Sequence, residues 1–121
     1  MESILTSIKK LLGISEEYEH FDADIIMHIN SVFMTLNQLG VGPADGFSIQ
    51  DEDAVWEDFI QGQKNIESVK SYMYLKVRLL FDPPLSSAVM ESMNRMVKEF
   101  EWRLYIAADP IESEREEENS K

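Results

Sequence analysis

A pair of prolines constrains the fold of this chain more than any other feature. In VRLLFDPPLSSAVM, residues 77–90, an apolar run ends at Asp82, Pro83 and Pro84 follow, and a second apolar pattern then begins. Proline has no backbone N–H, its ring clashes with the preceding helical turn, and it pushes the residue before it out of helical geometry. Because the connector is short, we expect an antiparallel αα-hairpin with a fixed corner at Asp82, Pro83 and Pro84.

Apolar residues recur at spacings of three and four on both sides of this corner and in three earlier segments, which predicts five helices. The first covers residues 3–12 and ends at Gly13. The second starts with Asp22 as N-cap and ends at Gly40. The brief third is capped by Asp51 or Asp53 and ends at Gly62. The fourth covers residues 65–81, and the fifth starts after Ser86 or Ser87 and continues to about Ala108.

These patterns predict an all-α fold: a small helical domain of about five helices, residues 1–109, built around a long αα-hairpin. Residues 110–121 form an acidic tail with few apolar residues, which we expect to be disordered when free. The helix over 65–81 is apolar on nearly all sides, so it lies at the centre of the fold or is shared with a neighbouring subunit. Phe47 and Ile49 alternate with polar residues, which gives weak support for a short strand.

Composition excludes several classes of protein. The length of 121 residues fits one domain. The chain has no cysteine, which excludes disulfides and cysteine-based zinc sites. A net charge of −12 argues against a protein that grips nucleic acid or an anionic membrane surface. No apolar stretch approaches the roughly 20 residues that span a bilayer, and the N-terminal segment is typical of an amphipathic helix of a cytoplasmic protein rather than a signal peptide.

No motif indicates an enzyme or a cofactor site. VGPADG, residues 41–46, lacks the lysine and spacing of a phosphate-binding loop and is typical of a surface turn. His28 and Asp24 share a helix face, but two ligands do not make a zinc site. The acidic run at residues 51–53 lacks the spacing of a calcium loop. We therefore predict no catalytic residue, no metal and no cofactor.

The apolar surplus on the last two helices points instead to protein contacts. In the last helix Phe100 falls on a different side from Trp102, Tyr105 and Ile106. That second side is either covered by a loop of the same chain or open to a partner, since Trp and Tyr are enriched among interface anchors. The candidate interface residues are Tyr72, Tyr74, Leu79, Phe81, Trp102, Tyr105, Ile106 and Ile111.

Three segments carry a resemblance to a known family: FDADIIMHINSVFMTLNQLGVGP at 21–43, WEDFI at 56–60, and ESVKSYMYLKVRLLFDPPLSSAVMESMNRMVKEFEWRL at 67–104. In their order and spacing the chain resembles the head–tail connector (adaptor) proteins of tailed phages and prophages of Gram-positive bacteria. The string from Tyr74 to Pro84, with the helix that follows, is the most specific part. The likeness lies in several segments together and not in one chemically diagnostic residue.

The resemblance implies a structural protein that assembles as a homo-oligomeric ring beneath the portal, with the portal's symmetry. Such a ring extends the DNA channel without reading DNA sequence and is the platform for the tail-completion (stopper) protein. It implies a location at the head–tail junction of the virion, and in the host cytoplasm during assembly. The family's C-terminal segment commonly docks against the portal, and here it corresponds loosely to residues 102–111 and the tail. An alternative that also fits the charge is a small acidic regulator or inhibitor of a basic protein.

Overall fold

The computed structural model describes residues 2–60 and 65–108 of the chain. Over these residues the fold is all-α, with one isolated antiparallel bridge between Ser3 and Val55 and no strand, which confirms the predicted fold class. The expected helix end at Gly62 and the acidic tail with Ile111 lie outside the described residues. The helices are α1 (Ile4–Leu11), α2 (Asp22–Gln38), α3 (Trp56–Phe59), α4 (Ile66–Phe81) and α5 (Ser87–Ala108).

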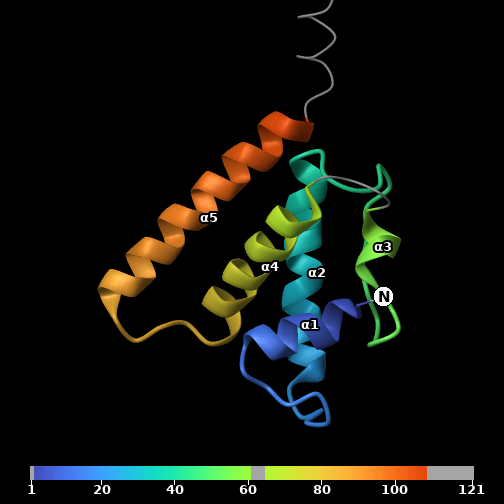
Figure 1. The fold of residues 1–121 in the computed structure, drawn as a ribbon, viewed down its shortest axis with the longest axis vertical. Helices are drawn as coiled ribbons and strands as arrows, with labels where there is room; N and C mark the ends of the chain where they lie inside the picture. Colours follow the sequence, from blue (N-terminus) through green and yellow to red (C-terminus); the bar gives the residue numbers. More distant parts are fainter. Residues whose placement is uncertain (1, 61–64, 109–121) are drawn as a thin grey trace, which may run out of the picture.

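The central helix is α4. It packs against α2 on one side and α5 on the other, while α1 crosses near the lower end of α2 (Figure 1). A helix that is apolar on nearly all sides is expected at such a position, because each side removes apolar surface from water. The buried side chains of α4 are Val69, Tyr72, Met73, Leu75 and Val77.

The proline corner forms as predicted. The fourth helix ends at Phe81, and Asp82 leaves helical geometry at φ −146° and ψ 71°, as expected for a residue before proline. Ser86 caps the next helix, since its hydroxyl accepts a hydrogen bond from the backbone N–H of Val89 at 3.4 Å. From this corner α5 runs back antiparallel to α4 and leans away from it at the corner end (Figure 1). Only Val97 and Leu104 of α5 are fully buried.

A buried lysine fixes the connection between α1 and α2. The amino group of Lys9 donates to the backbone carbonyls of Glu16 and Tyr18 at 3.0 and 2.8 Å. It also forms an ion pair with Asp22 at 2.8 Å. The prediction that Asp22 is the N-cap of α2 is therefore wrong: Phe21 occupies that position, and Asp22 is the first helical residue. Its carboxylate is engaged by a lysine from another helix, which helix-start propensities do not reveal.

The segment between α2 and α3 packs without forming the weakly supported strand. Phe47 packs against two aromatic rings, with centroid distances of 4.9 Å to Phe33 and 5.4 Å to Phe59. The side-chain amide of Asn30 donates to the carbonyl of Ile49 at 2.9 Å and accepts from its N–H at 2.8 Å. One side chain thus satisfies the backbone groups that a neighbouring strand would otherwise pair.

The short α3 is capped differently from the prediction. Its N-cap position is Val55, whose N–H donates to the carboxylate of Asp58 at 3.0 Å. Asp51 instead accepts a hydrogen bond from the N–H of Asp53 at 2.9 Å, which closes a turn before the helix. The predicted cap at Asp51 or Asp53 is therefore wrong, because a carboxylate inside the helix satisfies the first free N–H.

Candidate interaction surface

The side of α5 that faces away from α4 carries large apolar side chains. Trp102, Tyr105 and Ile106 are 63%, 46% and 41% exposed, whereas Phe100 is half-buried against the core. This separation is the one predicted from helical periodicity. No loop within residues 2–60 and 65–108 covers the three side chains, so within that part of the protein they are available to a partner.

Two basic residues share this side of α5. Arg95 and Lys98 are exposed and precede Trp102 by seven and four positions, spacings that place all three on one helix face. We call the surface formed by Arg95, Lys98, Trp102, Tyr105 and Ile106 the α5 outer face. The same spacings place the exposed Glu91 and Glu99 on this side, so the face combines charges of both signs with aromatic area.

Two Glu–Arg pairs are spaced four residues apart along α5, and only one of them forms an ion pair. The guanidinium of Arg103 lies 2.6 Å from the carboxylate of Glu99. Within the described residues Glu91 and Arg95 form no ion pair, and Arg95 instead donates to the hydroxyl of Ser92 at 3.2 Å.

Tyr72 is not exposed, which corrects the prediction that it lies at an interface. Its side chain is fully buried, and its hydroxyl donates to the Glu101 carboxylate at 2.6 Å. Burial raises the pKa of Tyr72 above its ordinary value, and the adjacent carboxylate raises it further. The phenol therefore stays protonated at neutral pH and ties α4 to α5, a contact that stabilises the hairpin rather than an assembly.

Tyr74 is half-buried and lines an open groove between α4, α5 and the start of the chain. The groove has a volume of about 540 Å³, and its apolar lining includes Leu11, Leu75, Met96 and Phe100. Leu79 is also half-buried and packs against the core. Of the residues predicted on α4, Tyr74 is therefore the one that lines this groove.

Phe81 lies at the end of α4, beside the proline corner. Its ring is 5.3 Å from that of Phe21 and 6.4 Å from that of His28, measured between centroids. The three rings line a hollow of about 580 Å³ together with Asp24. Among the described residues no three His, Asp or Glu side chains come together in a way that could hold a metal ion.

The tip of the hairpin carries a second exposed apolar cluster that the sequence reasoning missed. Leu85 is fully exposed, and Leu80 and Val89 on either side of the corner are about half-exposed. Leu85 belongs to no helical stripe, so a search by periodicity passes over it. The sequence does contain a signal for it: Leu85 directly follows two prolines, in a corner where its side chain has no core to pack into.

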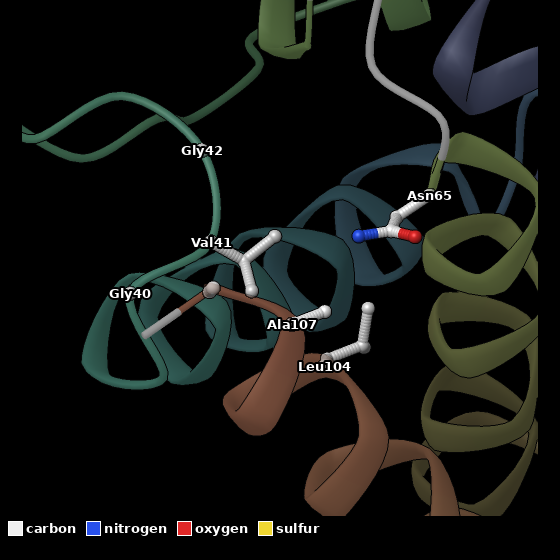
Figure 2. Close-up of a pocket in the computed structure, with 7 residues that line it drawn as sticks. Gly40, Val41, Gly42, Asn65, Leu104 and Ala107 are labelled. Carbon is white, nitrogen blue, oxygen red and sulfur yellow. The ribbon is translucent and has the colours of Figure 1, made fainter. Parts of the chain in front are cut away.

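A smaller pocket lies where the ends of three helices meet. Figure 2 shows Val41, Leu104 and Ala107 converging there, with the amide of Asn65 at its edge. The pocket has a volume of about 350 Å³, and Gly40, Gly42 and Ala108 complete its lining. Asn65 supplies its one polar side chain, which is too little for acid–base or metal chemistry.

The fold and these surfaces define a small all-α protein that leaves large apolar side chains exposed. Its hairpin exposes apolar residues on the α5 outer face and at the tip. No helix within residues 2–60 and 65–108 is long and apolar enough to cross a membrane.

Comparison with known protein families assigns this small all-α protein to one of them. Residues 4–110 match the family described as phage connector protein. The chain belongs to this family, which confirms the resemblance seen in the sequence and supports a connector role at the head–tail junction of a phage virion. No curated protein and no solved structure matches the chain.

Proposed function

We propose that the protein assembles as a ring beneath the phage portal, extends the DNA channel and provides the platform for the tail-completion (stopper) protein. The ring has the portal's symmetry. It performs no catalysis and needs no cofactor. The proposal combines membership of the phage connector family with the unpartnered apolar surface of the hairpin.

The observation that carries the proposal is that α5 buries little of its surface against the rest of the domain. This helix has 22 residues but buries only Val97 and Leu104 completely. A helix that protects so little of its surface gains little from packing on its own domain. Exposed apolar patches of this kind mark protein–protein contact sites, so the α5 outer face is the proposed portal-docking surface.

Two different apolar surfaces suit a ring. The hairpin tip with Leu85 protrudes, whereas the groove beside Tyr74 is hollow. A contact between unlike surfaces of neighbouring copies is heterologous, and such contacts generate a ring when the rotation closes. We propose that the tip and the groove face neighbouring protomers.

The charge distribution suits a channel that DNA passes without being held. Residues 2–60 contain 12 Asp and Glu but only two lysines, and one of them, Lys9, is buried. Residues 66–108 are nearly balanced, with six basic and five acidic side chains. A protein that binds duplex DNA neutralises phosphates with Lys and Arg. We propose that the acidic part repels the phosphates of passing DNA.

The test is to mix the purified protein with the portal of the same phage and to measure the mass of the complex. We expect several copies per portal, matching its subunit number. Replacing Trp102 by Ala should weaken the complex by about 30-fold, the loss of about 2 kcal/mol typical of a central aromatic anchor. Met34→Ala is the matched control, because Met34 is 66% exposed but lies on α2. Absence of any complex, or equal affinity of Trp102→Ala and wild type, would contradict the proposal.

A further inference from the structure

An aromatic hollow of about 580 Å³ lies where the connection after α1, the start of α2 and the end of α4 meet (Figure 1). The rings of Phe21, His28 and Phe81 line it, together with the aliphatic side chains of Leu12 and Ile14. Phe21 is 36% exposed, although its ring packs edge to face against Phe81. The hollow therefore offers open aromatic surface next to aliphatic surface.

One carboxylate in this hollow has no cation beside it. Asp24 and Asp82 are its two acidic side chains, and no lysine or arginine of the described residues lines it. The guanidinium of Arg78 lies 3.7 Å from Asp82. Asp24 forms no ion pair within residues 2–60 and 65–108, not even with His28 one turn further along α2. The dipole of α2 supplies about half a positive charge at this end, which offsets the Asp24 carboxylate only in part.

The chain itself offers few cations that could fill the hollow. Residues 11–60 contain 11 Asp and Glu side chains and no Lys or Arg. Of the three arginines among the described residues, Arg78 and Arg103 are paired with carboxylates four positions away, which leaves Arg95. A second copy of the chain also brings a further charge of −12, which opposes its approach to an acidic surface. The complementary group is therefore sought on a protein of different sequence.

We propose that the hollow binds an arginine side chain of a partner protein. The guanidinium plane stacks on the rings of Phe21 and Phe81, and its N–H groups donate to the Asp24 carboxylate. The aliphatic stem of the arginine lies along Leu12 and Ile14. Lysine fits less well, because its compact, strongly hydrated ammonium group neither stacks nor forms a bidentate pair.

The partner is a polypeptide rather than free arginine. No basic side chain of the described residues lines the hollow to receive the α-carboxylate of the free amino acid. An arginine within a chain carries no such carboxylate. The inference goes beyond the connector role, because it does not depend on which protein supplies the arginine.

Nuclear magnetic resonance of the full-length protein tests the proposal with N-acetyl-arginine amide as the probe. The backbone amide signals of Phe21, Asp24 and Phe81 should shift and saturate as the probe is added in the millimolar range. The citrulline derivative has nearly the same shape without the charge, and the lysine derivative has the charge without the plane. Each should bind about fivefold more weakly than the arginine probe. Absence of a saturating shift, or equal binding of the citrulline derivative, would overturn the proposal, and equal binding of the lysine derivative would overturn the assignment to arginine.

Two variants locate the bound probe. Asp24→Asn removes the charge and keeps the shape, and it should weaken binding of the arginine probe by about fivefold. Phe21→Leu keeps apolar volume but removes a ring, and it should weaken binding by about threefold. Asp45→Asn is the matched control, because Asp45 is exposed on the loop after α2 and the substitution makes the same change in net charge. Circular dichroism checks that each variant is folded. Equal affinity of Asp24→Asn and wild type for the probe would overturn the proposal.

Sedimentation of the protein alone at several concentrations separates a foreign partner from a second copy. Asp24→Asn should leave any self-association of the protein unchanged. Self-association that Asp24→Asn weakens would overturn the assignment to a different protein, because a second copy would then occupy the hollow.

Discussion

At the scale of single residues, Gly42 shows how closely the loop after α2 passes the core. Its φ is +91°, and a Cβ added there would clash with the ring of Phe59. We predict that Gly42→Ala lowers the free energy of unfolding by about 2–4 kcal/mol, from left-handed strain together with overpacking. Gly46→Ala is the matched control, because Gly46 has φ +89° and open space around it. It should cost only the strain, about 1–2 kcal/mol. Urea unfolding measures both, and equal losses would contradict the clash with Phe59.

Tyr72 shows where residue-level prediction from the sequence stops. Periodicity identified the apolar sides of the helix over 65–81, but it gives no direction for α5 relative to them. Whether Tyr72 faces a partner or the core depends on Glu101, which is 29 residues away in the sequence. By contrast, the sides of Trp102 and Phe100 were predicted correctly, because both lie on one helix and their relation is local.

At the scale of elements, the proline corner sets the direction in which α5 leaves the domain. We predict that replacing Pro83 and Pro84 by Ala leaves helix content unchanged or slightly higher, since alanine favours helix. Portal association should nevertheless weaken, because the corner no longer fixes the position of Leu85 and of the helix behind it. Circular dichroism measures the first effect and the mass of the portal complex the second. Leu85→Ser, with both prolines kept, separates loss of the exposed side chain from loss of the corner. Unchanged portal association in the double alanine variant would mean that the corner only ends the helix and has no role in assembly.

The bounds of the helices were predicted well from the sequence, whereas the capping residues were not. Apolar spacing, glycines and prolines are local signals, and they placed the five helices within a few residues. Asp22, Asp51 and Asp53 were assigned as caps from residue type alone. Asp22 is engaged by Lys9 of another helix, and Asp51 closes a local turn. A carboxylate before a helix has several uses, and only the three-dimensional arrangement selects among them.

At the scale of the whole molecule, most of the excess negative charge is separated from the two apolar clusters of the α4–α5 hairpin. Residues 2–60 carry most of the excess negative charge, while the hairpin of α4 and α5 is nearly balanced and exposes the apolar clusters. The sequence predicted an all-α fold with surplus apolar area. It left open whether the helix over 65–81 is central or shared with a neighbouring subunit, because the order in which helices pack is a tertiary property.

This separation distinguishes the connector from an acidic regulator of a basic protein. A regulator bound through its net charge of −12 should lose affinity steeply as salt rises. A connector docked through Trp102, Tyr105 and Ile106 relies on apolar burial, which salt does not screen. We predict that portal affinity does not fall between about 0.05 and 0.5 M NaCl, over which the Debye length drops from about 14 to about 4 Å. Affinity measured by sedimentation at several salt concentrations checks this. A steep fall, with one copy bound per partner, would favour the regulator, because screening then removes the force that holds the complex.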